Sequence, residues 1–155
     1  MNFTRSKTYR IFSILAVISV MGIIFYLSAQ NSTDSKETST MVGGFLSMIF
    51  KGNVPQEELR TFAHFCEYAL LGFLMYNAFY SFKVKFAPLT SIIASFLYAL
   101  SDEIHQIFVD GRAFQLIDLT IDLGGIICGT IVIFILFRLI TKISLKISKK
   151  ENIYD

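Results

Sequence analysis

The chain has 155 residues, of which 54% are hydrophobic and only 17% are charged, and its formal net charge is +2. This composition is typical of membrane proteins and argues against an ordinary soluble domain. The chain has no glycine-rich phosphate loop, zinc-type cysteine pattern or basic patch suited to nucleic acid, so we expect no nucleic-acid partner. Its two cysteines, Cys66 and Cys128, fall within apolar stretches, where we expect small core residues rather than a disulfide.

The first apolar stretch predicts a membrane-spanning helix over about 11–29. It follows Arg5, Lys7 and Arg10, as the apolar part of a signal peptide would. However, it is longer than the roughly 7–15 apolar residues of a cleaved signal, and Leu27 stands where a cleavage site would need a small residue. We therefore expect a first helix that is retained in the mature protein.

Two contrasting segments follow. Residues 31–40 are nearly all Ser, Thr and charged, which predicts a solvated loop. The apolar run 41–50 is too short to span a hydrocarbon core about 30 Å thick, which favours a short interfacial or re-entrant helix. A second spanning helix is expected over 57–80, because Pro55 and the acids after it form a typical helix start.

A third helix is expected over 89–108 and a fourth over 116–140, followed by a basic cytoplasmic tail over 141–155. Basic residues dominate the N-terminus, the loop with Lys83 and Lys85, and this tail, whereas the other two loops are mixed or acidic. The positive-inside rule therefore places both termini in the cytoplasm.

These elements predict an all-α, polytopic membrane protein with a single domain over residues 1–155. It has four transmembrane helices and a short interfacial or re-entrant helix between the first and the second. The loops 31–60 and 109–115 then face the outside.

Ionisable residues interrupt the apolar runs near the outer end of the expected bundle. Counted from the cytoplasmic helix ends at about 1.5 Å per residue, Glu67, Asp102 and Asp122 all lie at roughly 20–27 Å, which places them in one layer toward the outer side. Gly125 and Gly129 share a helix face with Asp122 and form a small-residue pair that lets a neighbouring helix approach closely. We therefore expect this face to point into the bundle. Helical spacing groups further partners, namely His64 with Glu67 and Tyr68, Asp102 with His105 and Gln106, and Asp118 with Asp122.

The cost of burying charge argues that these ionisable groups have a function. A charged side chain at mid-membrane costs about 2.5–3.5 kcal/mol, so several facing lipid would cost roughly as much as the stability of a whole domain. The acids also outnumber the arginines, since Glu67, Asp102, Glu103, Asp118 and Asp122 stand against Arg60 and Arg112. Some acids must therefore be neutralised by a proton, by protonated His64 or His105, or by a bound cation.

Three segments carry most of the polar residues: AHFCEYALLGF from Ala63, ALSDEIHQIFVDGR from Ala99, and LIDLTIDLGGIICG from Leu116. With a looser SAQNS from Ser28, they resemble the VanZ-like family of bacterial membrane proteins. That family is named for a protein of glycopeptide resistance clusters associated with tolerance of teicoplanin. The resemblance covers nearly the whole chain and implies a bacterial plasma-membrane protein. The family's characteristic polar positions fall on His64, Glu67, Asp102, Glu103, Gln106, Arg112 and Asp118.

The chain departs from this family pattern at three positions. Thr61 stands where a lysine is usual, and Asp110 where a proline is usual. Asp122 stands where the family often has asparagine, which makes this site more negative than the family norm. Asp122 is therefore the acid that we expect to be neutral or to bind a cation.

The leading functional hypothesis is a cell-envelope protein with a polar cavity on the outer side, contributing to glycopeptide tolerance or envelope maintenance. In an enzymatic version, Glu67 or the Asp102 and Glu103 pair acts as general base and His64 assists proton transfer. Arg112 would hold the phosphate of an anionic envelope lipid or glycan. Further substrate contacts are expected from Gln106, His105, Asp118 and Asp122.

Other functions stay open on the sequence. A divalent cation on the carboxylates is one variant, but residue spacing alone does not establish oxygen ligation, so the cofactor is unknown. The rival classes are a non-catalytic binder of a drug or lipid headgroup and a small proton- or cation-coupled carrier. A carrier would need polar residues toward the cytoplasm, whereas the inner halves of the second and fourth helices are almost wholly apolar. The sequence does not decide between enzyme and binder, and it predicts no oligomeric state.

Overall fold

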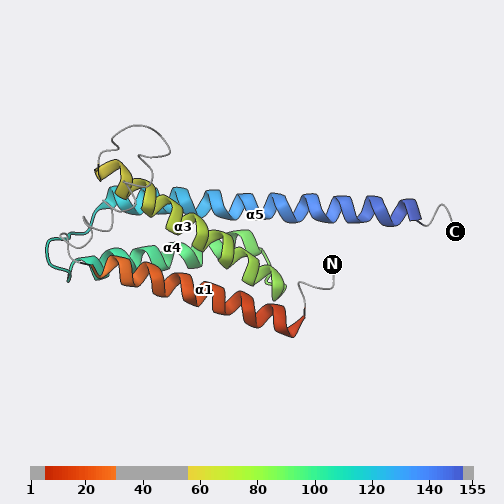
Figure 1. The fold of residues 1–155 in the computed structure, drawn as a ribbon, viewed down its shortest axis with the longest axis horizontal. Coiled ribbons are helices and arrows are strands. Elements are labelled where there is room, and N and C mark those ends of the chain that lie inside the picture. Colours follow the sequence, from red (N-terminus) through yellow and green to blue (C-terminus); the bar gives the residue numbers. More distant parts are fainter. Residues whose placement is uncertain (1–5, 31–55, 152–155) are drawn as a thin grey trace.

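The computed structural model describes residues 6–30 and 56–151, which form four α-helices. They are α1 (Lys7–Ser28), α3 (Gln56–Ser81), α4 (Ala87–Gln106) and α5 (Leu116–Glu151). Figure 1 shows the helices lying along roughly one direction, with each one running opposite to the one before it in the chain. The all-α prediction is confirmed for the described residues. The short helix expected over 41–50 lies outside them.

The helix ends follow local chemistry. Ser6 caps α1 by accepting a hydrogen bond from the backbone N–H of Tyr9 at 3.1 Å. The turn before α4 is tight, with Lys83 and Phe86 at φ of 59° and 56° in the left-handed region. The fourth helix, expected to end near 140, continues to Glu151, so most of the expected basic tail is helical.

The contact between α3 and α5 is the most extensive in the bundle, although α3 also packs against α1 and α4. A Cβ atom at Gly125 would overlap the backbone of Phe65, and one at Gly129 would overlap the backbone of Ala69. On the other side, a Cβ at Gly72 would lie 2.5 Å from the carbonyl oxygen of Ile126. The expectation that the glycine pair of α5 admits a neighbouring helix is confirmed.

Hydrogen bonds attach α1 to the helices beside it. The hydroxyl of Tyr9 donates to Asn77 of α3, and the amide of Asn77 donates to Ser13 at 3.1 Å. The Tyr98 hydroxyl of α4 donates to the Met21 carbonyl of α1 at 2.6 Å. These polar groups are satisfied inside the bundle, as a membrane environment requires.

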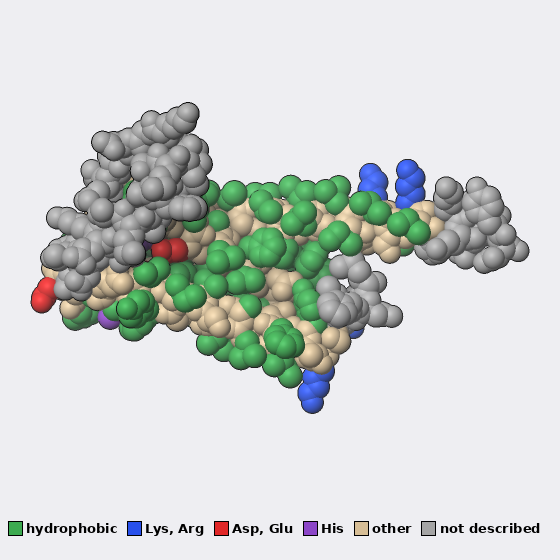
Figure 2. All heavy atoms as spheres, viewed as in Figure 1, with side chains coloured by type: hydrophobic (Ala, Val, Ile, Leu, Met, Phe, Trp, Pro, Cys, Tyr) green, Lys and Arg blue, Asp and Glu red, His purple; other side chains and the backbone are tan. Residues whose placement is uncertain are grey.

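The outer surface of the bundle is strongly apolar. Two helices, Lys7–Ser28 and Leu116–Ile147, are long and apolar enough to cross a membrane, and only 22% and 28% of their apolar windows are buried in the protein. Figure 2 shows hydrophobic side chains covering the flank between an end with Lys and Arg and an end with acids and His. This surface is consistent with a membrane protein. It includes Cys66 and Cys128, which are free and exposed, so the expectation of small core residues was wrong.

The glycine contacts generate a prediction with a matched control on the same helix. Gly129→Ala should lower the melting temperature of the detergent-solubilised protein, because overpacking costs about 1–3 kcal/mol. Gly124→Ala should leave it unchanged or raise it, because the nearest atom to a new Cβ is the Phe65 ring at 3.9 Å and Ala is the better helix former. If both variants shift the melting temperature alike, the close contact of α3 and α5 does not hold.

Candidate functional site

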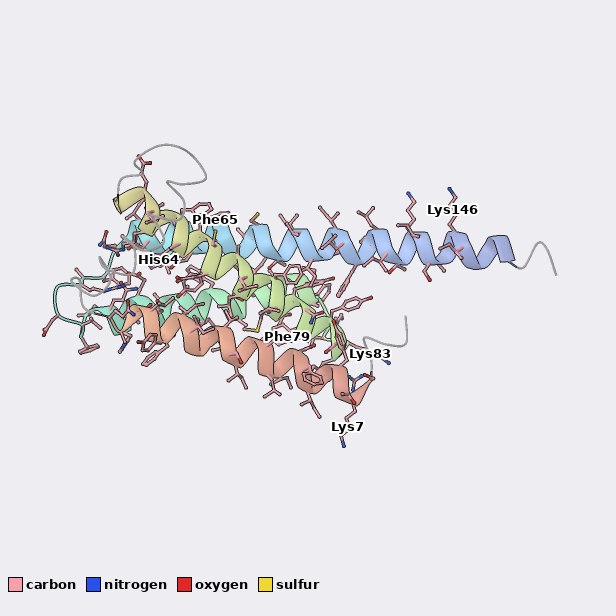
Figure 3. All side chains as sticks on the ribbon, in the orientation of Figure 1. Lys7, His64, Phe65, Phe79, Lys83 and Lys146 are labelled. Atoms are coloured by element: carbon pink, nitrogen blue, oxygen red, sulfur yellow. The ribbon has the colours of Figure 1, made fainter. Side chains whose placement is uncertain are left out.

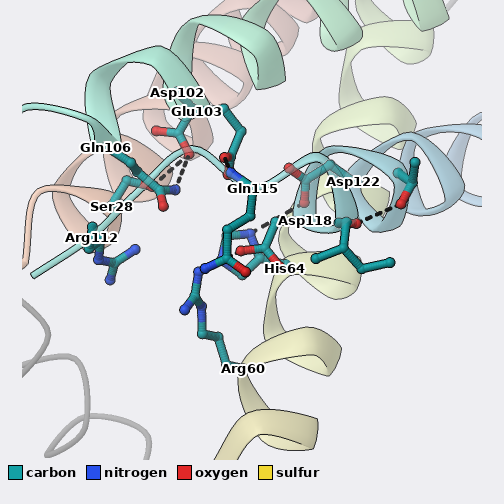
Figure 4. A network of polar contacts seen from close by, with 12 residues as sticks. Ser28, Arg60, His64, Asp102, Glu103, Gln106, Arg112, Gln115, Asp118 and Asp122 are labelled. Carbon is teal, nitrogen blue, oxygen red and sulfur yellow. Dashed lines mark hydrogen bonds and ion pairs between the residues drawn. The ribbon is translucent and has the colours of Figure 1, made fainter.

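Buried polar side chains gather at the end of the bundle where α1 and α4 end and where α3 and α5 begin (Figure 4). Each helix contributes at least one of them. Those with less than a tenth of their surface exposed are Ser28, His64, Tyr68, Asp102, Glu103, Gln106, Asp118 and Asp122. We call this set, together with Arg60, Glu67 and Arg112, the outer polar cluster, after the side of the membrane on which the sequence analysis expects it.

Asp102 joins three helices. Its Oδ2 accepts hydrogen bonds from the Ser28 hydroxyl of α1 at 2.7 Å and from the Tyr68 hydroxyl of α3 at 3.1 Å. A third, longer bond of 3.4 Å comes from the Gln106 amide one turn along α4. The other oxygen of Asp102, Oδ1, is buried and has no hydrogen-bond partner among the described residues.

Glu103, the next residue on α4, is held from a different side. Its Oε2 accepts the backbone N–H of Gln115 at 2.9 Å, in the loop that leads into α5. Its Oε1 is buried without a partner in the described part of the chain. Adjacent acids of one helix are therefore fixed by separate elements, and each keeps one unpartnered oxygen.

Two polar contacts link α3 and α5, an ion pair and a contact between a histidine and a carboxyl group. Arg60 and Asp118 form an ion pair with 2.5 Å between Nη2 and Oδ2. One turn deeper, Nδ1 of His64 lies 3.3 Å from Oδ1 of Asp122. Both pairs join residues 58 apart in the sequence, as does the hydrogen bond from Thr130 to the Gly72 carbonyl. A constant separation requires two parallel helices in register. The glycine contacts between α3 and α5 therefore also align the residues of these polar pairs.

Arg112 lies in the loop between α4 and α5 and is half-buried. Its Nη2 donates to the Leu27 carbonyl at 3.3 Å, at the C-terminal end of α1 where the helix dipole favours a cation. Burial lowers the pKa of Arg112, and the nearby charge of Arg60 lowers it further. Arginine nevertheless stays protonated in proteins, so the cluster keeps this positive charge.

The structure brings together all but one of the residues that the sequence analysis singled out. Glu67 is half-buried and close enough to His64, Asp102 and Asp122 for their charges to interact. His105 differs, because its ring stacks on Phe25 of α1 with centroids 4.5 Å apart. Among the described residues it makes no hydrogen bond or ion pair with the acids of the cluster.

Three contributors were missed or undervalued by sequence reasoning. Ser28 entered the sequence analysis only as the start of the looser SAQNS segment, but its hydroxyl donates to Asp102. Tyr68 lies four residues after His64, so helical spacing pointed to its face without identifying its partner. The backbone N–H of Gln115 gives no sequence signal, because every residue other than proline has such a group.

The cluster is short of positive charge and of hydrogen-bond donors. Its five acids face two arginines and one histidine. Four buried carboxylate oxygens, on Asp102, Glu103 and Asp122, make no hydrogen bond in the described ranges, although Oδ1 of Asp122 lies 3.3 Å from Nδ1 of His64. Leaving such an atom unsatisfied costs about 1–3 kcal/mol, so protons, cations or ligand hydroxyl and amino groups would bind favourably here. Within the described residues, no three His, Cys, Asp or Glu side chains are arranged to hold a metal ion.

Comparison with known proteins gives one match. The family model described as VanZ/LLP1 matches residues 12–138, which is most of the chain. No curated protein and no solved structure matches the chain.

The two aspartates of α5 should respond differently to neutralisation. Asp118→Asn removes the carboxylate that Arg60 contacts, and because that arginine is 35% exposed we expect a moderate loss of about 1–2 kcal/mol of stability. Asp122→Asn replaces the acid that we expect to be neutral with a neutral amide of nearly the same shape, so we expect almost no loss of stability. Melting temperatures of the two detergent-solubilised variants measured side by side test this. An equal loss would show that Asp122 is an ionised partner of His64.

Proposed function

The chain belongs to the VanZ/LLP1 family, and we propose that it is a four-helix plasma-membrane protein whose outer polar cluster acts on the headgroup of an envelope lipid or glycan. The supporting observation is the set of buried carboxylate oxygens that make no hydrogen bond, on Asp102, Glu103 and Asp122, in the same cluster as Arg60 and Arg112. These acceptors suit hydroxyl or amino groups, and the guanidinium groups suit a phosphate or carboxylate. A polar lipid headgroup or glycan carries both kinds of group.

The proposed topology has all four helices crossing the membrane. At about 1.5 Å per residue, the 26 residues of α3 and the 20 residues of α4 reach roughly 39 and 30 Å, enough for a hydrocarbon core about 30 Å thick. Their lower mean hydropathy reflects polar residues such as Asp102 and Glu103, which are buried in the bundle rather than exposed to lipid. The basic end then lies in the cytoplasm, with both termini, and the outer polar cluster faces the outside.

In the enzymatic version of the proposal, Glu67 or the Asp102 and Glu103 pair removes a proton from an attacking water or hydroxyl. The oxygen of that water or hydroxyl forms a bond to the phosphorus or carbon atom of the substrate while the bond from that atom to the leaving oxygen breaks. Protonated His64 donates its own proton to the leaving oxygen, and the carboxyl group keeps the proton that it removed. Arg112 binds the anionic group of the substrate. Such a change to an outer-leaflet lipid or glycan alters the surface that a glycopeptide drug meets, which links the reaction to drug tolerance.

A second candidate is a non-catalytic binder of a drug or a lipid headgroup. It is favoured by Asp102, because three hydrogen bonds to one oxygen hold this side chain rigidly, as suits a binding group. A carrier has less support. Below the cluster, the buried Ser91 hydroxyl of α4 donates to the Pro88 carbonyl of its own helix instead of lining a polar path.

Variants of the cluster test the proposed function. Glu67→Gln, Asp102→Asn and Arg112→Lys should abolish function while membrane abundance stays near wild type, since a lysine does not replace the planar fork of a guanidinium. Asp110→Asn, at an exposed acid of the same loop as Arg112, is the matched control and should behave as wild type.

Turnover of isolated envelope lipids by the purified protein separates the two candidates. The enzyme predicts product with wild-type protein and none with the three cluster variants. The binder predicts that the wild-type protein retains the lipid without forming product, and that the three cluster variants do not retain it. If membrane abundance falls as much as function in all three variants, these residues have a structural role and the proposal is wrong.

A further inference from the structure

A groove of about 670 Å³ lies at the opposite end of the bundle, between the last turns of α3, the start of α4 and the middle of α5. Its size falls within the range of about 300–1,000 Å³ that is usual for ligand sites. Figure 3 shows Lys7, Lys83 and Lys146 at this end, far from His64 of the outer polar cluster. The groove is therefore separate from the proposed active end.

The floor of the groove is aromatic. The rings of Tyr76 and Tyr80 stack at 5.9 Å, and Phe137 lies 6.0 Å from the first and 4.7 Å from the second. Phe134 packs edge-on against Tyr76 at 6.3 Å. Such a surface accepts a hydrocarbon chain and presents tyrosine hydroxyls at an interface.

The rim of the groove is positively charged. Arg138 and Lys142 line it from one face of α5, being four residues apart, and no acid is among the lining residues. Lys85 lies over the ring of Phe86, another lining residue, at 5.1 Å. The first turn of α4, with Pro88, also borders the groove, and its dipole adds positive potential there.

The occupant must therefore combine an apolar chain with an anionic group. Past Lys142, α5 continues with Ile143 and Ile147, which are 58% and 56% exposed. A helix with exposed apolar and basic residues in this arrangement is typical of segments that lie against anionic lipid. A lipid of the surrounding leaflet meets these requirements, whereas a soluble phosphate leaves the aromatic floor unused.

We propose that the groove binds an anionic phospholipid of the leaflet at the basic end, with its phosphate between Arg138 and Lys142 and an acyl chain along Tyr80 and Phe137. This site rests on the membrane placement of the bundle and not on the chemistry of the outer polar cluster. In the proposed topology the leaflet is the cytoplasmic one.

The chain has no tryptophan, so a single introduced tryptophan reports on one place. The full chain carrying Tyr80→Trp is reconstituted in phosphatidylcholine vesicles with a fraction of brominated phosphatidylglycerol or brominated phosphatidylcholine. Bromine quenches the fluorescence of a tryptophan in contact with the lipid. We expect phosphatidylglycerol to be preferred at this position by about five-fold for each cation, the factor that corresponds to about 1 kcal/mol per basic side chain at an anionic surface.

Three controls identify the cause. Ile18→Trp, at a position 58% exposed on α1, should show equal quenching by both lipids. Adding Arg138→Gln and Lys142→Gln to Tyr80→Trp should remove the preference, while Lys146→Gln, outside the lining, should leave it. Phe137→Trp repeats the measurement if Tyr80→Trp fails to fold.

Several results would overturn the proposal. One is equal quenching of the groove tryptophan by the two lipids. Another is a preference for phosphatidylglycerol that persists without Arg138 and Lys142. A third is a loss of that preference in Lys146→Gln as large as in the variant without Arg138 and Lys142. Relief of quenching by inorganic phosphate at constant ionic strength would show a site for soluble anions instead.

Discussion

The direct contact between the backbones of α3 and α5 is what allows buried charges to be placed in this bundle. Gly125 and Gly129 admit α3 because side chains there would overlap its backbone. The two helices run parallel in register, so the same contact that packs the glycines aligns Arg60 with Asp118 about two to three turns away, toward the polar end. The close packing of α3 and α5 at the glycines thus determines where the charged residues of these two helices meet. The helix α4 adds the buried acids Asp102 and Glu103 to the same cluster.

The two ends of the bundle have opposite chemistry. The outer end holds an excess of carboxylates, with buried oxygens that lack donors, beside Arg60 and Arg112. The basic end has an aromatic groove with Arg138 and Lys142 at its rim. In the proposed topology the basic end lies against the anionic cytoplasmic leaflet, and the acid-rich end faces the lipids or glycans on which we propose that it acts.

Much of this organisation was predictable from helical periodicity, because burial in a bundle and spacing on a helix obey the same geometry. Gly125 and Gly129 share a helix face with Asp122, and this predicted that Asp122 points into the bundle. The expectations for His105 and Cys66 failed because they depended on how each helix is rotated about its axis and on which helix packs against it. At about 100° per residue, His105 and Gln106 flank the direction of Asp102 on opposite sides, and only the packing of α1 decides that the histidine stacks on Phe25. Cys66 was misplaced because a protein core and lipid look alike in composition.

The central claim is that all four helices span the membrane with the outer polar cluster outside, and labelling of Lys83→Cys in whole cells tests it most directly. The loop between α3 and α4 is cytoplasmic if four helices span, but outside if only α1 and α5 do. Ala113→Cys and Thr38→Cys should react with an impermeant maleimide, whereas Lys149→Cys and Lys83→Cys should not, with the wild-type chain giving the background from its own cysteines. Labelling of Lys83→Cys together with Ala113→Cys would contradict four spans, and labelling of Lys149→Cys would reverse the orientation.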